Sequence, residues 1–265
     1  MAILEQAPGL LEALRGAMTP KFVATRSGLG LPNVVPIVST TPADDQPDTL
    51  FFGNFLLRKS IQNLQEDRRL GILVITQDLQ GWILKGDFVE FQSTGRYVDL
   101  QNSSALLRYN AYTGIRNAGV IRVKSVEGRV RVSKLQVARD YLLAKLSARG
   151  GAEAVHSGVD MPLAVRREFA RMVAVKVLAW IGADGYPLVI PALSLQPAGT
   201  RALVARTDSS LPEPRPGDWV ASNILTFEAI SYQVKGRWMK NGRAGIIQVQ
   251  EVYAGGPPLP GGRVA

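Results

Sequence analysis

The alternation of apolar and polar positions along the chain predicts a mainly β protein. Short apolar runs of strand length are bounded by segments rich in Gly, Pro, Asn and Asp, as expected for strands joined by turns. Helical spacing of apolar residues is confined to four stretches, 8–17, 56–66, 137–148 and 163–172. Many strands with few helices indicate antiparallel sheets that close on themselves, so we expect Greek-key-type β-barrels with peripheral helices.

The strand pattern occurs twice along the chain. The segment GLGLPNVVPIVS (28–39) matches GADGYPLVIPALS (182–194), and their prolines and final serines coincide at an offset of 155 residues. Further along, GWILKGDFVEF (81–91) matches SYQVKGRWMKN (231–241) at an offset of 150 residues. A pattern that recurs at fixed spacing indicates a repeated structural unit. We therefore predict two tandem barrels.

The drop in offset indicates that the second copy lacks part of the first. In the first copy a helix at 56–66 lies between predicted strands at 49–54 and 70–76. The corresponding segment of the second copy, TDSSLPEPRPGD (207–218), contains three prolines, which are incompatible with an ordinary helix. We expect a loop in place of this helix.

The remaining segments complete the expected organisation. VIRVKSVEGRVRVS (120–133) alternates like a hairpin that turns at Glu127-Gly128. The C-terminal residues are rich in Pro and Gly and are expected to be flexible. We expect a first barrel at 1–136, a helical connection at 137–172, a degenerate second barrel at 173–256 and a flexible tail at 257–265.

Composition limits the chemistry that the chain can perform unaided. There is no cysteine and there is one histidine, His156, so thiolate nucleophiles, disulfides and Cys-ligated metals are excluded. We expect no metal site, and redox chemistry would need a borrowed cofactor. Glu5 stands where a secretory signal would carry basic residues, and no apolar run approaches the roughly 20 residues that span a bilayer. A cytoplasmic protein without a membrane partner is expected.

The formal net charge is +9, and cations are dense between Arg108 and Lys134, where Glu127 is the only acidic residue. One interpretation is an anionic partner, such as a phosphorylated cofactor or a nucleic acid. The favoured alternative is a solvated strand face on a basic protein. Aromatic residues, on which single-stranded nucleic acid would stack, are few in this region, so nucleic acid is the less favoured partner.

Arg58 and Lys59 stand at the first turn of the predicted helix 56–66. Cations there oppose the helix dipole at a cost of about 0.3–1 kcal/mol each. A bound anion offsets this cost, because free backbone N–H groups, the two cations and the Ser60 hydroxyl would converge on a phosphate. An exposed basic pair whose stems lie over the sheet is the alternative interpretation.

The order of these features resembles the pyridoxamine 5'-phosphate oxidase-like family of FMN-binding split barrels. The resemblance rests on a hairpin with Pro-Asn-Val-Val-Pro, a strand ending Phe-Phe-Gly-Asn, Arg-Lys-Ser opening a helix, and a strand reaching Lys-Gly. It covers about residues 8–95, and residues 163–253 in weaker form. It implies that Arg58 and Lys59, with Ser60, bind the FMN phosphate. It also implies that the flavin is bordered by Phe52, Gly53, Asn54, Asn33, Val34, Val35, Pro36, Trp82 and Lys85.

The chain departs from the oxidases of this family at several positions. Leu57 replaces a small hydroxyl residue, Asn33 replaces an arginine, and no equivalent of the C-terminal substrate-phosphate motif is found. Oxidation of vitamin B6 is therefore not the expected reaction. Family members are typically dimers with flavin at the interface, so the two repeats would form a pseudo-dimer within one chain, with a homodimer as a further option. One phosphate site per chain is expected, over which Trp238 or Arg237 could close, although a core position is favoured for Trp238.

The resemblance implies an FMN-binding flavoprotein that passes hydride or electrons between a nicotinamide or small substrate and the flavin. No Gly-x-Gly-x-x-Gly fingerprint follows a strand, so NAD(P)H would bind transiently. Deazaflavin F420 and haem are alternative cofactors, His156 being the one candidate haem ligand. Two other functions stay open: a flavin- or haem-binding protein without turnover, and a degenerate barrel without cofactor that acts in interactions.

Overall fold

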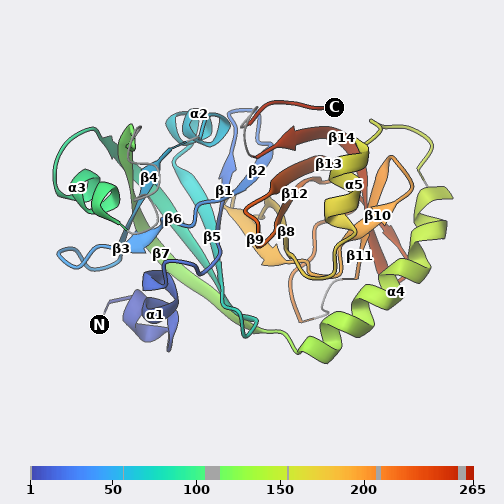
Figure 1. Cartoon of the computed structure of the whole chain (residues 1–265), viewed down its shortest axis with the longest axis horizontal. Helices are drawn as coiled ribbons and strands as arrows, with labels where there is room; N and C mark the ends of the chain where they lie inside the picture. The colour runs from blue at the N-terminus through green and yellow to red at the C-terminus, as the bar shows by residue number, and fades with distance from the viewer. Residues whose placement is uncertain (1, 56, 105–113, 154, 207–209, 256–260) are drawn as a thin grey trace.

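The computed structural model describes all residues except 1, 56, 105–113, 154, 207–209 and 256–260, and it consists of two seven-stranded antiparallel sheets (Figure 1). The first sheet has the strand order β2-β1-β5-β6-β7-β4-β3. Its strands are β1 (Lys21–Arg26), β2 (Pro32–Pro36), β3 (Thr41–Pro42), β4 (Thr49–Asn54), β5 (Arg69–Ile75), β6 (Gln80–Gln92) and β7 (Asn117–Arg131).

The second sheet has the order β10-β11-β14-β13-β12-β8-β9. Read from β9 to β10, this order matches that of the first sheet strand for strand. The mainly β fold with two tandem antiparallel barrels is thus confirmed. Its strands are β8 (Val175–Ile181), β9 (Pro187–Pro191), β10 (Gln196–Ala198), β11 (Ala202–Ala205), β12 (Trp219–Leu225), β13 (Ser231–Asn241) and β14 (Ala244–Ala254).

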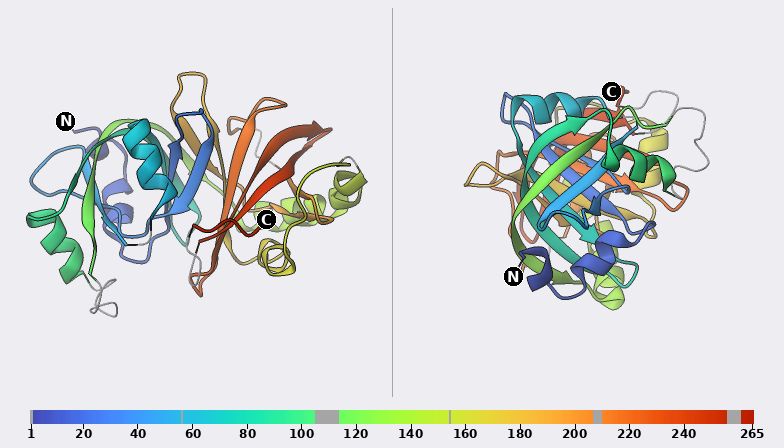
Figure 2. Two further views of the ribbon diagram at one scale, coloured as in Figure 1. Left: turned by 90° about the horizontal axis from the view of Figure 1, so that it is seen from above. Right: turned by 90° about the vertical axis from the view of Figure 1, so that its left-hand side faces the viewer.

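Helices lie at the periphery of both sheets (Figures 1 and 2). None of the helices in the described part of the chain combines the length and the hydrophobicity of a membrane span. Residues 210–218, the described part of the segment that replaces the second-repeat helix, contain no helix, as expected. The helices are η1 (Leu4–Gln6, a 3-10 turn), α1 (Leu10–Arg15), α2 (Lys59–Glu66), α3 (Arg96–Ser103), α4 (Lys134–Glu153) and α5 (Leu163–Phe169).

The two sheets pack against each other through the β1–β2 hairpin and its counterpart β8–β9, which lie between the barrels (Figure 2). Apolar side chains of β1, β5 and β6 join those of β8, β9 and β12 in one continuous core. The approach is close at Gly71, where an added Cβ would lie 2.2 Å from the carbonyl oxygen of Pro187. This packing brings the ends of β2 and α2 beside β13 and β14, where the candidate site lies.

The expected hairpin at 120–133 is wrong. β7 is one strand that pairs with β6 over most of its length, and the register shifts so that Ile83 faces Gly128 while Leu84 faces Val126. Glu127 is therefore the extra residue of a β-bulge rather than part of a turn. Pairing of the whole strand with β6 outweighs the local turn preference of Glu-Gly.

The C-terminal segment differs in part from the expected flexible tail. Residues 261–265 hydrogen-bond with β14, through Gly262 to Ala254 and through Val264 and Ala265 to Val252. Residues 257–260 of the expected tail lie outside the described residues. Helix α3 has no counterpart among the expected elements.

Candidate functional site

Helix α2 begins at Lys59, three residues after the predicted start at 56, and the basic pair lies at its amino end. Arg58 is the N-cap residue with an exposed side chain, and Lys59 is the first helical residue. No acidic residue stands in the first turn, and no side chain caps the helix. The amino end of α2 therefore combines two cations with the positive end of the helix dipole.

Lys59 reaches across the interface to β14 of the second repeat. Its Nζ donates to the hydroxyl of Tyr253 at 2.8 Å and lies 4.2 Å from the centroid of the Tyr253 ring. The same hydroxyl donates to a carboxylate oxygen of Glu251 at 2.8 Å, which is 3.9 Å from the Lys59 ammonium. Lys59, Tyr253 and Glu251 thus form one polar chain between the repeats.

A second lysine, Lys235 of β13, faces the same group. It is 2% exposed, and its ammonium lies 5.7 Å from the centroid of the Tyr253 ring. Burial lowers the pKa of Lys235 to about 7, with a further lowering by the neighbouring charge of Lys59 and a partial offset by Glu251. We call Arg58, Lys59 and Lys235 the cation cluster.

Buried amides connect the cluster to β2. Asn33 donates to the Ser60 hydroxyl at 3.0 Å and accepts from the side chain of Gln233 at 3.1 Å. Gln233 also accepts from the backbone N–H of Val34 at 2.9 Å, and Asn223 donates to the Val34 carbonyl at 3.2 Å. The backbone groups on the free edge of β2 are therefore satisfied by side chains of the second repeat.

The expected β4 residues make their contacts within the first repeat. Phe52 lies in the core of the first barrel and contacts Phe91 edge-on, with ring centroids 6.4 Å apart. A Cβ on Gly53 would lie 2.8 Å from Ile115, on the opposite face of β4. Asn54 donates to Asn117 on β7, while its own side-chain oxygen is buried without a partner among the described residues.

The structure does not bring Trp82, Val35 or Lys85 into the cluster. Trp82 is buried in the first barrel beneath α1, and Val35 packs at the edge of the same core. Lys85 lies at the other end of the interface, where its ammonium contacts Asp184 at 2.7 Å and Glu127 at 2.8 Å. Burial opposes its charge, but these two carboxylates raise the pKa of Lys85.

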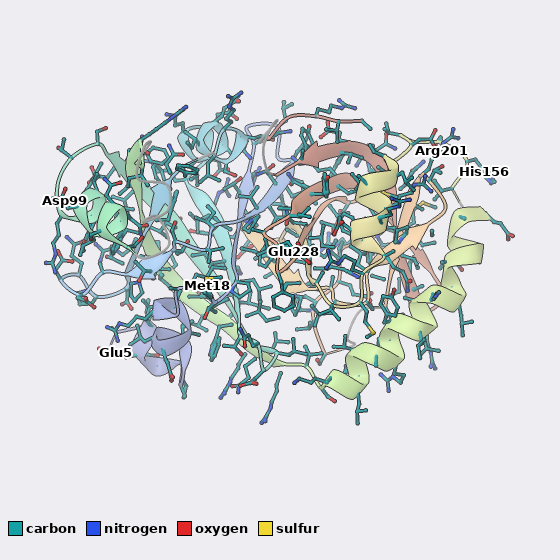
Figure 3. The ribbon with its side chains drawn as sticks, in the orientation of Figure 1. Glu5, Met18, Asp99, His156, Arg201 and Glu228 are labelled. Atoms are coloured by element: carbon teal, nitrogen blue, oxygen red, sulfur yellow. The ribbon has the colours of Figure 1, made fainter. Side chains whose placement is uncertain are left out.

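Three further residues named from the sequence lie elsewhere. Trp238 is fully buried inside the second barrel, in the favoured core position. Arg237 stacks over Trp219 at 4.9 Å and donates to the Gly217 carbonyl. His156 is exposed at the far end of the second repeat, away from α2 (Figure 3). No group of three or more metal-ligating side chains occurs in the described part of the chain.

The basic region on β7 alternates as a strand face does. Arg122 and Lys124 are exposed, and Lys124 lies 3.3 Å from a carboxylate oxygen of Asp87. Arg129 donates to Gln80 and lies 5.6 Å from the Trp82 ring. Arg108 lies outside the described residues. These contacts agree with the solvated-face interpretation.

Sequence reasoning did not assign the second-repeat half of the cluster. Lys235 carried one signal, because Lys235-Gly236 aligns with Lys85-Gly86 in the repeat. No sequence signal marks Tyr253, Glu251 or Gln233, because their role depends on how the two barrels pack.

Comparison with known proteins is limited to partial structural similarity. No protein-family model and no curated protein matches the chain. An FMN-binding protein from Syntrophomonas wolfei is 17% identical with a TM-score of 0.40, over 50% of this chain and 88% of that chain. HupZ of Group A Streptococcus is 20% identical with a TM-score of 0.37, over 46% of this chain and 95% of that chain. HutZ, a haem storage protein from Vibrio cholerae, is 13% identical with a TM-score of 0.35, over 49% of this chain and 95% of that chain.

Proposed function

We propose that this protein binds a phosphate-bearing cofactor of the flavin class, with FMN as the first candidate, at the cation cluster between the repeats. The observation that carries the proposal is the buried ammonium of Lys235 beside Lys59. Two lysine ammonium groups lie near one carboxylate, that of Glu251. Burial and the neighbouring charge of Lys59 disfavour the charged form of Lys235, and a phosphate dianion would favour that form.

The donors present fit a phosphate group. Lys59 and Lys235 would contact it from the two repeats, and Arg58 at the helix N-cap would reach it from solvent. Ser60 already accepts from Asn33, so its own hydroxyl hydrogen is available to a ligand. Fixed cations and helix N–H groups suit phosphate because they neutralise its charge without reorganising.

The ring of a flavin would need further adjustment. The resemblance implies that the ring borders β2, but Gln233 and Asn223 hold the Val34 backbone. These two side chains would have to release Val34 before a ring could bind there. A bound flavin would supply electron or hydride transfer. The residues described here would bind its phosphate and hold the two repeats around it.

Deazaflavin F420 and haem are alternative cofactors, since each carries anionic groups that lysines bind. Haem is the less favoured of the two, because the single His156 lies away from the cluster (Figure 3). A carrier that binds cofactor without turnover would use the same site. Reduction of the bound cofactor by NAD(P)H would distinguish an oxidoreductase from such a carrier.

The test begins with the visible absorption spectrum of the purified protein, which distinguishes flavin, deazaflavin and haem. Calorimetric titration then compares FMN with riboflavin, which lacks the phosphate. We expect FMN to bind at least tenfold more tightly, and the double variant Arg58→Ala, Lys59→Ala to lose this preference. Equal affinity for the two ligands, or no effect of the double variant, would overturn the proposal.

A further inference from the structure

A cavity of about 260 Å³ lies in the first repeat between α1, β3 and α3. Apolar side chains, among them Leu14 and Phe51, form part of its wall, and Lys21, Gln101 and Ser104 add polar groups. None of its lining residues belongs to the cation cluster. It is a separate candidate site.

Lys21 places a charge in the cavity wall. Its side chain is 1% exposed, and its Nζ donates to the carbonyls of Gly16 at 2.7 Å and Val38 at 3.1 Å. Burial lowers the pKa of Lys21 to about 8. An ammonium has three N–H donors, so one is left for a ligand. The hydroxyl of Ser104 is also buried without a partner among the described residues.

Lys176 is the equivalent of Lys21 in the second repeat, at an offset of 155 residues. A tyrosine side chain covers the Lys176 ammonium. The ring of Tyr141, from α4, lies 5.4 Å from the Lys176 ammonium. The Tyr141 hydroxyl donates to the Ala170 carbonyl at 2.6 Å, and its backbone carbonyl accepts from Gln196 at 2.7 Å.

These contacts correspond to the cavity of the first repeat. At the offset of 155, Lys176, Ala170 and Gln196 fall on Lys21, Arg15 and Thr41. All three first-repeat residues line the cavity. Tyr141 therefore occupies in the second repeat the place that is open in the first, and it shows which chemistry that place accepts.

We propose that the cavity of the first repeat binds a small phenol, one aromatic ring with a hydroxyl group, in the position that Tyr141 takes in the second repeat. The Lys21 ammonium faces the ring by a cation–π contact. The cavity is smaller than the roughly 300–1,000 Å³ of pockets for drug-sized ligands, which suits a single ring. This proposal does not depend on the cofactor site.

The test uses 4-methylphenol, which is the side chain of tyrosine, and measures stoichiometry by calorimetry and ligand-observed NMR. Wild type is expected to bind one equivalent. Thr41→Phe fills the cavity and is expected to weaken binding at least tenfold. Tyr141→Ala opens the matching space in the second repeat and is expected to bind two equivalents, and the double variant one. Toluene and cyclohexanol, which lack the hydroxyl or the aromatic ring, are expected to bind at least tenfold more weakly.

The Tyr141→Ala variant also validates the assay. If it binds one equivalent while wild type binds none, phenol binding is detectable and the first-repeat cavity does not provide it, which overturns the proposal. If circular dichroism shows that Tyr141→Ala is unfolded, the proposal is tested by comparing the 4-methylphenol affinity of wild type with that of Thr41→Phe. Equal binding by these two, or toluene binding as tightly as 4-methylphenol, also overturns it.

Discussion

Lys85 and Lys235 hold the same position in the two repeats but meet opposite surroundings. Each precedes a glycine at which the register of its strand pair shifts. Lys85 contacts the carboxylates of Asp184 and Glu127, whereas Lys235 is buried beside Lys59. One end of the interface is thus neutralised by the chain itself, and the other keeps an excess of positive charge.

This contrast predicts the effect of removing each lysine. Lys235→Met is expected to weaken FMN binding about tenfold or more, because one charge-assisted hydrogen bond contributes about 1.5–3 kcal/mol. Lys85→Met, the matched control, should leave the affinity within about twofold. Titration calorimetry on both variants checks this. Equal losses would show that Lys235 acts on the fold rather than on the ligand.

Stability is expected to rise with pH because of buried lysines. Burial lowers the pKa of Lys176 to about 7 from its ordinary value of 10.5. Between these values the unfolded chain binds a proton that the folded chain lacks, so the free energy of unfolding increases as pH rises. In Lys176→Met this increase should be smaller by about 3 kcal/mol between about pH 6.5 and about pH 9.5. Lys145→Met, an exposed lysine on α4, should leave the slope unchanged in urea titrations.

Close packing between the repeats predicts that Gly71→Ala destabilises the protein. The added methyl would lie 2.2 Å from the Pro187 carbonyl oxygen, so β9 would have to move. We expect a loss of about 1–3 kcal/mol in the free energy of unfolding. Gly81→Ala is the control, because its Cβ would lie 3.4 Å from the nearest atom. Urea unfolding that finds the two variants alike would contradict this.

Gln233→Leu is expected to destabilise the interface through unmet hydrogen bonds. The substitution removes the acceptor of the Val34 N–H and the donor to Asn33, both buried. Leaving such groups unpaired costs about 1–3 kcal/mol each. Gln248→Leu, whose amide bonds to Ser157 at the surface, is the control and should cost less than about 0.5 kcal/mol. Chemical denaturation of both variants measures the difference.

Local pattern was enough to predict most strands and the presence of α2. The bounds of β4 and β13 agree with the segments that the sequence marks, and β4 is buried along its whole length. Helix α3 was not expected, because its eight residues, RYVDLQNS, carry too few apolar positions to mark a helical face.

The candidate site could be predicted only in part. The basic pair at α2 is a local signal, but Lys59 meets Lys235 and Tyr253 through the packing of two sheets. Repeat alignment shows that Lys85 and Lys235 are equivalent. It does not show which of them faces the helix of the first repeat, because that depends on which end of the interface the helix covers.

Because both repeats belong to one chain, the second repeat could lose its helix between β11 and β12 while the first kept α2. In a homodimer every substitution appears on both sides of the symmetry axis, so a change that abolishes one pocket abolishes its twin. Here each half can mutate alone. Asp184 gives Lys85 a permanent counter-charge, whereas the equivalent Lys235 lies beside a second lysine, Lys59. Covalent linkage thereby permits the two equivalent lysines to have different surroundings, which identical subunits related by symmetry cannot provide.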